Sequence, residues 1–433
     1  MITEPPIEPA GGVRRPAAEP GSDTADRRFV RRGSGWLGAI AVLLTFGVLT
    51  EAKLWRPDVR FGIRENVQIG EAQAWWSGRL DLPERLWDTA LKDGRVYSYF
   101  PPMFTILAAG VVPFFNGVPH ALIVVLVAAV PICAYLLFWQ LTRSAAWGAV
   151  LSIGLVCGSS VFPVLDKTLR GASPYNVNHT LATMGLLLFL IDYFGRKRVW
   201  PAAIGLGIAT LSRQLTFVYA LPLCAMAWWG GPSSRRVGRT APAVIACVLI
   251  AGIYGGLNTL KFGHPLHTGY MLNHEGRDDI FAREARAHGL LSTTWVPRNL
   301  YYTNLGPPDL HLVEIEGRNE LYLRPNTMGT GIWWTTPLLL WVFFDARKVW
   351  RDRSTAVLLV AAVLLFGMLM FWHATGSNQR GFNRYSLDYL PAILALIAPR
   401  CIMPGRRWIT LGMIVWSVLY FVAVLPQPNI RVW

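Results

Sequence analysis

Long apolar stretches alternate with polar segments along this chain of 433 residues. A helix that crosses a bilayer needs about 20 largely apolar residues. The pattern predicts candidate spans at 35–54, 101–118, 119–141, 147–165, 177–195, 199–212, 215–230, 240–260, 329–345, 355–374, 386–400 and 407–426. The predicted fold class is therefore all-α, a polytopic bundle of transmembrane helices.

Two long polar segments interrupt the apolar pattern, at about residues 51–100 and 261–328. Both contain clustered Asp, Glu, Arg and Tyr, and the second also contains His; a lipid-facing helix does not accommodate such clusters. A chain organised in this way usually performs its chemistry or binding at one membrane face. We therefore expect the functional residues in and beside these two loops.

The charge pattern favours a membrane protein and argues against nucleic-acid binding. The chain is 53% hydrophobic and 15% charged, with a formal net charge of +15. Five groups of its basic residues precede the first span or fill short linkers, which the positive-inside rule places in the cytoplasm, next to anionic lipids. These groups are Arg14, Arg15, Arg27, Arg28, Arg31 and Arg32; Arg196, Lys197 and Arg198; Arg235, Arg236 and Arg239; Arg347, Lys348, Arg351 and Arg353; and Arg400, Arg406 and Arg407.

The same rule predicts the topology. Residues 1–33 lack periodicity and are predicted to be a disordered cytoplasmic tail, whereas 34–430 form the transmembrane domain of an inner-membrane protein. With the N-terminus inside, both long loops lie outside, as do 166–176 and 373–385. That requires an even number of crossings between the two long loops, so the Pro-interrupted segment 101–118 is expected to be re-entrant or partial. About eleven spans remain.

Neither the cysteines nor the histidines predict a metal site. The five cysteines (Cys133, Cys157, Cys224, Cys247 and Cys401) lie in or at the ends of apolar segments, without a CxxC pair, and are expected to be buried. His264, His267, His274, His288 and His311 occur in the second long loop, but Pro265 disrupts helical spacing in H-P-L-H, and no HExxH is present. No cofactor is specified; a divalent cation that helps to neutralise phosphate is left open.

The first long loop begins with a helical pattern. Residues 65–78 read as an amphipathic helix, and the pair Trp75-Trp76 is typical of a helix that lies at the membrane interface. Asp93-Gly94 marks a turn. The stretch that contains Tyr97 and Tyr99 then returns the chain to the bilayer.

Four motifs resemble those of C-type membrane glycosyltransferases (GT-C). They are A-x-A-W-W-x-G at 72–78 followed by D-G-x-x-Y-x-x-F-P-P at 93–102, N-x-x-x-F-G-x-P-x-x-x-G-Y at 258–270, the glycine-aromatic segment at 329–337, and R-Y-x-x-x-x-L-P at 384–391. The resemblance covers about residues 36–400. It is closest to the branch with protein O-mannosyltransferases, aminoarabinose transferases and rhizobial lipopolysaccharide glycosyltransferases.

The resemblance implies an enzyme, a hexosyl- or pentosyltransferase. It would move a sugar from a polyprenyl-phosphate donor to a lipid, glycan or protein acceptor at the non-cytoplasmic face. It also implies an acidic residue in the first outer loop that acts as base toward the acceptor hydroxyl. By its distance from the Ala/Trp helix that residue is Glu65, with Asp58 and Glu71 as alternatives. A positioned carboxylate contributes on the order of 10²–10⁴-fold in rate.

The remaining candidate residues bind the donor phosphate or the sugar. Arg213 lies between two apolar segments, where a charge is costly and is by default a functional candidate. A guanidinium at the outer end of a span can clamp phosphate, which applies to Arg380 and Arg384. The predicted set is completed by Lys167 and Arg170 for phosphate and by Tyr97, Tyr99, Tyr175, His179 and Tyr270 for substrate.

Two other functions fit parts of the pattern. A lipid-linked saccharide flippase or transporter, without catalysis, would be expected to show internal repeats and several charges within the bundle. The sequence shows no convincing repeat and few such charges. A scaffold protein for envelope synthesis would tolerate neutral replacement of Glu65, Arg213 and Arg384 together.

Overall fold

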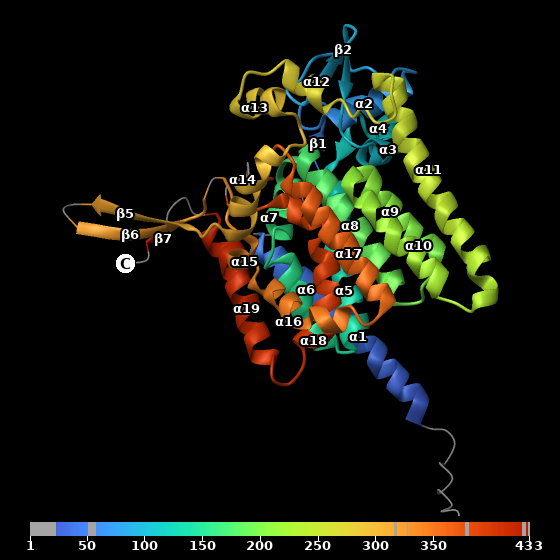
Figure 1. Ribbon diagram of the computed structural model, residues 1–433, viewed down its shortest axis with the longest axis vertical. Coiled ribbons are helices and arrows are strands. Elements are labelled where there is room, and N and C mark those ends of the chain that lie inside the picture. The colour runs from blue at the N-terminus through green and yellow to red at the C-terminus, as the bar shows by residue number, and fades with distance from the viewer. Residues whose placement is uncertain are drawn as a thin grey trace, which may run out of the picture.

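The computed structural model describes residues 23–50, 58–315, 318–326, 328–376, 381–426 and 430–431. Figure 1 shows a bundle of helices, a layer of short elements across one end of it, and a β-hairpin that projects from its side. The bundle consists of α1 (Asp23–Leu49), α5 (His120–Thr142), α6 (Ala145–Val156), α7 (Val161–Gly171), α8 (Pro174–Phe194), α9 (Val199–Ser212), η1 (Gln214–Tyr219), α10 (Ala220–Trp229), η2 (Ser233–Arg235), α11 (Arg236–Phe262), α15 (Ile332–Thr335), η5 (Pro337–Leu340), α16 (Trp341–Val349), α17 (Arg353–Met370), η6 (Arg384–Asp388), α18 (Leu390–Cys401), α19 (Arg407–Leu419) and η7 (Tyr420–Val424).

The bundle confirms an all-α integral membrane fold. Within the described ranges, five helices are long and apolar enough to cross a membrane, and the pair α6–α7, bent by 68°, makes a sixth if it counts as one span. Shorter apolar helices occupy Trp36–Leu49, Val199–Ser212, Gln214–Trp229 and Leu390–Cys401. Helices thus form where the hydropathy pattern predicts them, and the total of about eleven spans stays a prediction.

Two segments differ in detail from their predictions, whereas 101–118, expected to be re-entrant or partial, forms no single long helix. Residues 101–118 fold as two short helices, α3 (Met103–Ala109) and α4 (Val112–Phe115), each too short to cross a bilayer. Residues 166–176 are not a loop, because α7 runs to Gly171 and α8 begins at Pro174. Helix α1 begins at Asp23, inside the segment predicted to be a disordered tail, and residues 1–22 of that tail lie outside the described residues.

The layer of short elements, here called the loop layer, is built from the two long polar segments. Its first part holds β1 (Arg60–Phe61), α2 (Val67–Trp76), β2 (Thr89–Lys92) and β3 (Arg95–Ser98), with β1 paired to β4 (Val118–Pro119). Its second part holds α12 (Tyr270–Glu275), α13 (Ile280–His288), η3 (Thr293–Trp295), α14 (Val296–Leu300) and η4 (Tyr301–Leu305). The projecting sheet comprises β5 (Asp309–Ile315), β6 (Arg318–Arg324) and β7 (Ile430–Arg431).

The hairpin β2–β3 turns at the predicted Asp93-Gly94 pair. Both residues have a positive φ, 50° and 74°, the left-handed conformation that favours Asp, Asn and Gly in tight hairpins. The register places Ala90 opposite Tyr97. Tyr97 therefore points into the loop layer and packs edge-on against Phe262, with ring centroids 5.8 Å apart.

Helix α2 confirms the helix predicted at 65–78 but is more buried than an interfacial helix. Asn66 caps it by accepting a hydrogen bond from the Gln68 amide at 2.9 Å. Most of its residues are buried. Trp76 is exposed, and its indole Nε1 donates to the Ala109 carbonyl of α3 at 2.7 Å. The helix is thus an internal part of the loop layer with one indole at its edge.

The loop layer has its own small core, which joins it to the bundle. Tyr97, Tyr99 and Phe100 pack there with Phe262, the last residue of α11. Next to it, the ammonium of Lys261 is ion-paired with Glu71 of α2 and donates to the Ser98 carbonyl at 3.1 Å. The long helix α11 is in this way fixed to both α2 and β3.

Candidate functional site

A cavity of about 280 Å³ lies between the loop layer and the bundle. Its walls come from both parts of the molecule and are rich in aromatic and basic side chains. They are Trp87, Tyr99, Tyr175, Arg213, Tyr270, Asn273, His274, Arg277, Phe281, Trp372, His373, Ala374, Arg384 and Tyr385. Five residues of the predicted site meet here: Arg213, Arg384, Tyr99, Tyr175 and Tyr270.

Arg213 is held in place by a buried carboxylate. It follows the last residue of α9, and its Nη2 and Nε atoms donate to Asp388 Oδ2 and Oδ1 at 2.8 and 3.3 Å. Asp388 is 1% exposed. The Arg213 guanidinium also lies over the ring of Tyr385, 4.9 Å from its centroid. A two-pronged ion pair of this kind fixes the orientation of the guanidinium plane.

Arg384 is the second guanidinium of the cavity and is more deeply buried than Arg213, and no carboxylate pairs with it among the described residues. The residue is 6% exposed and stacks over Tyr175 and Tyr385, 4.8 and 5.3 Å from their centroids. Its Nε atom has no hydrogen-bond partner in the described part of the chain. A buried charge without a counter-charge is costly. The arrangement is therefore suited to receive an anion.

The aromatic side chains form a continuous wall beside these cations. Tyr99 stacks on Phe100 at 4.6 Å and contacts Tyr270 at 4.7 Å between centroids. Tyr270 in turn meets Trp372 edge-on at 5.6 Å. Flat rings with polar edges provide apolar contact and hydrogen bonding together, a combination that suits a polar ring such as a sugar.

Asp88 is the carboxylate that contacts this wall. The hydroxyl of Tyr175 donates to Asp88 Oδ1 at 2.5 Å, and the hydroxyl of Tyr99 lies 3.5 Å from the same oxygen. Burial raises the pKa of Asp88, whereas the Tyr175 hydroxyl and the charges of Arg277 and Arg384 oppose that rise. A carboxyl with an elevated pKa beside a cavity has the usual character of an acid–base group.

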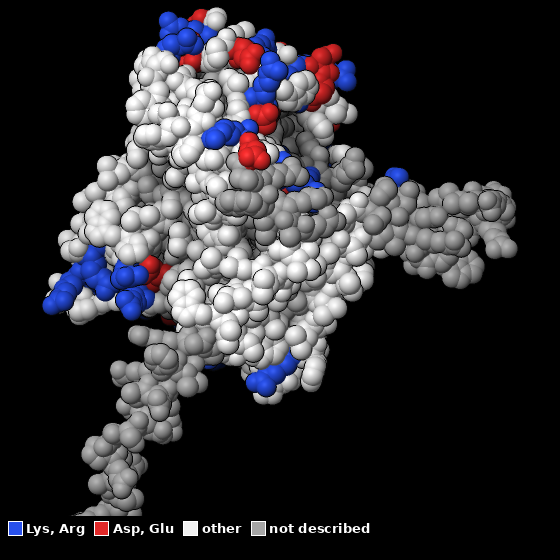
Figure 2. Space-filling model, turned by 180° about the vertical axis from the view of Figure 1, so that it is seen from behind, with Lys and Arg blue, Asp and Glu red and all other residues white. Residues whose placement is uncertain are grey.

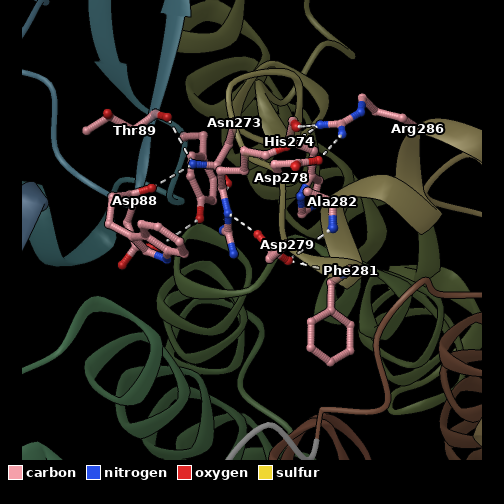
Figure 3. A network of polar contacts seen from close by, with 12 residues as sticks. Asp88, Thr89, Asn273, His274, Asp278, Asp279, Phe281, Ala282 and Arg286 are labelled. Carbon is pink, nitrogen blue, oxygen red and sulfur yellow. Dashed lines mark hydrogen bonds and ion pairs between the residues drawn. The ribbon is translucent and has the colours of Figure 1, made fainter.

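The outer wall of the cavity is the segment with α12 and α13, which is fixed to the β2 region (Figure 3). The amide of Asn273 donates to the carbonyls of Trp87 and Thr89, at 3.0 Å each. Arg277 donates to Asn273 Oδ1 at 3.2 Å and to Asp279 Oδ2 at 2.7 Å. Asp279 caps α13 through the amides of its first turn. These bonds join two loops that are far apart in the sequence.

Two histidines complete the wall. The rings of His274 and His373 meet edge-on at 4.9 Å, and both Nδ1 atoms have no hydrogen-bond partner within the described ranges. Burial and the charge of Arg277 lower the pKa of His274, so this imidazole is neutral and can either donate or accept a hydrogen bond. In the described part of the chain, no group of three or more His, Cys, Asp or Glu residues could hold a metal ion.

The carboxylates predicted to act as base lie elsewhere. Glu71 is buried in the ion pair with Lys261 and accepts a hydrogen bond from Thr105 at 2.7 Å. Glu65 is exposed and accepts from the Gly62 amide at 2.8 Å within a turn. Asp58 is exposed on the loop layer. None of the three is among the described residues that line the cavity.

Four other predicted site residues are also placed away from the cavity lining. Tyr97 belongs to the core of the loop layer. His179 is 2% exposed, and its Nδ1 lies 4.0 Å from Asp388 Oδ1, behind Arg213. Lys167 lies over the ring of Phe382 at 5.2 Å, and Arg170 is ion-paired with Asp166 at 2.8 Å. Arg380 lies outside the described residues.

The structure adds cavity-lining residues that the sequence did not single out for substrate contact, and also Asp88, which does not line the cavity itself but contacts its tyrosine wall. The lining residues are Trp87, Asn273, His274, Arg277, Phe281, Trp372, His373, Ala374 and Tyr385. The signal for Tyr385 was available, since it follows Arg384 in the R-Y motif. Asp88 carried no local signal, because its environment depends on Tyr175, which is distant in the sequence.

One comparison with known sequences agrees with the glycosyltransferase resemblance. GPI mannosyltransferase 1 of Trypanosoma brucei brucei is 24% identical over 251 residues, which cover 50% of this chain and 58% of that protein. The solved structure of ArnT from Cupriavidus metallidurans bound to undecaprenyl phosphate covers 88% of this chain and 63% of its own, at 12% identity and a TM-score of 0.44, too low to weigh further. This chain thus spans less than two thirds of the length of either protein. No family model matches.

Proposed function

We propose that this protein is a membrane glycosyltransferase that transfers a sugar from a polyprenyl-phosphate donor to an acceptor hydroxyl at the non-cytoplasmic face. The observation that carries the proposal is the pair of Arg213, which is partly buried, and Arg384, which is buried, in an aromatic cavity between bundle and loop layer. The four GT-C-like motifs and the similarity to a curated mannosyltransferase support the same reaction class.

In the proposed complex, the donor phosphate binds at Arg384 and Arg213. No carboxylate is ion-paired with Arg384 among the described residues, although the charge of Arg384 acts on Asp88, so an incoming phosphate supplies a direct counter-charge. The sugar then lies against Tyr99, Tyr270 and Trp372, which line the same cavity. Positive charge at the phosphate also stabilises the negative charge that develops on it as it leaves.

We propose Asp88 as the general base in place of Glu65, Asp58 or Glu71. Asp88 contacts two tyrosines of the cavity wall, whereas Glu71 is neutralised by Lys261 and Glu65 is occupied within a turn. The acceptor oxygen attacks the anomeric carbon and loses its proton to the carboxylate. The bond from that carbon to the phosphate oxygen breaks, and the lipid phosphate leaves with the electron pair. A single displacement of this kind inverts the anomeric centre.

The test is sugar transfer from a panel of radiolabelled polyprenyl-phosphate sugars, in membranes that carry matched amounts of each variant. We expect transfer by the wild type and a loss of about 10²-fold or more with Asp88→Asn. Glu65→Gln is the matched control, since it removes one carboxylate charge from the same loop without touching the cavity wall. We expect it to stay within about twofold of the wild type.

Three outcomes would contradict parts of this proposal. Full activity of Asp88→Asn with loss in Glu65→Gln would return the base to Glu65. Full activity of both variants would exclude either residue as the base. No transfer from any donor in the panel, together with movement of a lipid-linked saccharide across vesicles that contain the protein, would replace the enzyme by the flippase alternative.

A further inference from the structure

A second cavity, of about 300 Å³, lies at the end of the bundle opposite the loop layer. Three short connections surround it: the turn between α8 and α9, the end of α10, and the turn between α16 and α17. We call it the basic pocket. It is lined by Tyr193, Lys197, Ala225, Met226, Trp229, Gly230, Arg351, Asp352, Arg353 and Ser354.

Cations predominate at the rim of the basic pocket. Lys197, Arg351 and Arg353 line it and are exposed, whereas Asp352 is its one acidic lining residue in the described chain. The Asp352 carboxylate accepts hydrogen bonds from the Ser354 hydroxyl and from the Thr355 amide, the latter at 3.0 Å. Asp352 thus caps α17 and leaves an excess of positive charge at the rim. Figure 2 shows blue residues gathered at the left edge of the molecule, away from the loop layer at the top.

Fixed contacts hold the rim and the floor of the pocket together. Arg239 of α11 donates to the carbonyls of Gly230 and Lys197, at 2.9 and 3.1 Å. The hydroxyl of Tyr193, which is 2% exposed, donates to the Ser354 carbonyl at 2.6 Å and joins α8 to the start of α17. The connections that carry the cations are therefore tied to neighbouring helices.

The composition of the pocket matches an amphiphilic anion better than a free one. Apolar Ala225 and Met226 and the half-exposed indole of Trp229 lie next to the cations. Indoles are enriched at the headgroup level of membranes, and basic pockets between transmembrane helices bind acidic headgroups. α8, α10 and α17, which border the pocket, are apolar helices.

We propose that the basic pocket binds the headgroup of an anionic glycerophospholipid, with the phosphate between Lys197, Arg351 and Arg353 and the glycerol region against Trp229. This site lies at the opposite end of the molecule from the cavity of the proposed glycosyl transfer. It requires neither the donor nor the transfer reaction.

The test is lipid binding by the purified full-length protein in detergent, with retained lipid counted by native mass spectrometry. The probes are phosphatidylglycerol, phosphatidylcholine and inorganic phosphate. We expect phosphatidylglycerol to bind in preference to phosphatidylcholine. We expect Lys197→Gln/Arg351→Gln/Arg353→Gln to weaken phosphatidylglycerol binding roughly a hundredfold, from about fivefold for each cation near the membrane surface.

The matched control is Arg196→Gln/Arg235→Gln/Arg347→Gln. It removes the same number of positive charges from the same end of the bundle, but none of its residues lines the pocket. We expect it to bind phosphatidylglycerol within about threefold of the wild type. The charge-preserving variant Arg351→Lys/Arg353→Lys is the control for misfolding, and we expect it to retain phosphatidylglycerol binding.

Several results would overturn the proposal. Equal losses of phosphatidylglycerol binding in the pocket triple and in the control triple would show that general surface charge, and not a specific site, attracts the lipid. Unchanged binding by the pocket triple would exclude these cations, and equal binding of phosphatidylcholine would exclude recognition of charge. Inorganic phosphate that displaces phosphatidylglycerol at equal concentration would assign the pocket to a soluble phosphate compound.

Discussion

Arg384 has the strongest electrostatic reason to bind a ligand of any side chain in the cavity. It is buried, stacked between Tyr175 and Tyr385, and has an Nε atom without a partner in the described chain. Arg213 differs, because Asp388 already neutralises it. We therefore expect Arg384 to supply most of the net positive charge toward a bound phosphate. We expect Arg213 to orient that phosphate.

Replacement of Arg384 should affect donor use strongly. We expect Arg384→Gln to lower kcat/KM for the polyprenyl-phosphate sugar by about 10²–10³-fold. Arg384→Lys keeps the charge but loses the planar, bidentate geometry, so its loss should be smaller. Steady-state transfer assays with varied donor measure both effects. Arg170→Gln is the control, since Arg170 pairs with Asp166 away from the cavity; a comparable loss there would argue against a specific phosphate site.

The acid limb of the pH profile should report the Asp88 carboxyl. Burial raises its pKa, and a base must be deprotonated, so activity should fall as the pH decreases through that raised value. The Tyr175 hydroxyl stabilises the anion by donating to Asp88. Tyr175→Phe removes this stabilisation, which raises the pKa further and moves the acid limb of kcat/KM to higher pH.

The measurement is kcat/KM across the acid range for the wild type, Tyr175→Phe and Tyr97→Phe. Tyr97 is a buried tyrosine of the loop layer that does not line the cavity, and its variant should keep the wild-type limb. If the acid limb of kcat/KM in Tyr175→Phe stays at the wild-type pH, that limb does not report the Asp88 carboxyl.

At the scale of the elements, the ion pair between Lys261 of α11 and Glu71 of α2 connects the bundle to the loop layer. Both side chains are buried. We expect Lys261→Met to lower the free energy of unfolding by about 3–5 kcal/mol, because it leaves Glu71 as an uncompensated buried charge. The double variant Lys261→Met/Glu71→Leu removes both charges and should recover much of that loss.

Thermal unfolding of the purified variants measures this effect, and the transfer assay adds a second result. If the double variant is stable and active, Glu71 has a structural role and is not the base. A double variant that is as unstable as Lys261→Met would indicate that Thr105 or the Ser98 carbonyl, and not the charge pair, dominates the contact.

The elements could be predicted from the sequence to a much greater extent than the site. Hydropathy and turn residues are local properties, so most of the apolar helices, helix α2 and the turn at Asp93-Gly94 occur where the pattern places them. The cavity depends on contacts between distant segments. Asn273 holds α12 to β2 across 184 residues, and Tyr175 reaches Asp88 across 87. No local pattern encodes such pairs, which explains why Arg213 and Arg384 were found and Asp88 was not.

At the scale of the whole molecule, the two cavities occupy opposite ends of the bundle, and the charge pattern predicts which end faces the cytoplasm. The linkers with Lys197, Arg235 and Arg351 lie at one end, and α12 with its cavity residues lies at the other (Figure 1). We expect the basic end inside and the loop layer outside. The two short helices α3 and α4 are consistent with this orientation, because neither adds a crossing.

Cysteine labelling tests the orientation directly. Glu275 at the end of α12 and Ser234 between α10 and α11 are both exposed, so a cysteine at either position is accessible to a reagent on its side. We expect a membrane-impermeant maleimide to label Glu275→Cys in intact cells and Ser234→Cys only after permeabilisation. The wild type is the control, since its five cysteines are buried or partly buried. The reverse pattern would place the aromatic cavity in the cytoplasm and exclude transfer at the outer face, whatever the activity of the isolated protein.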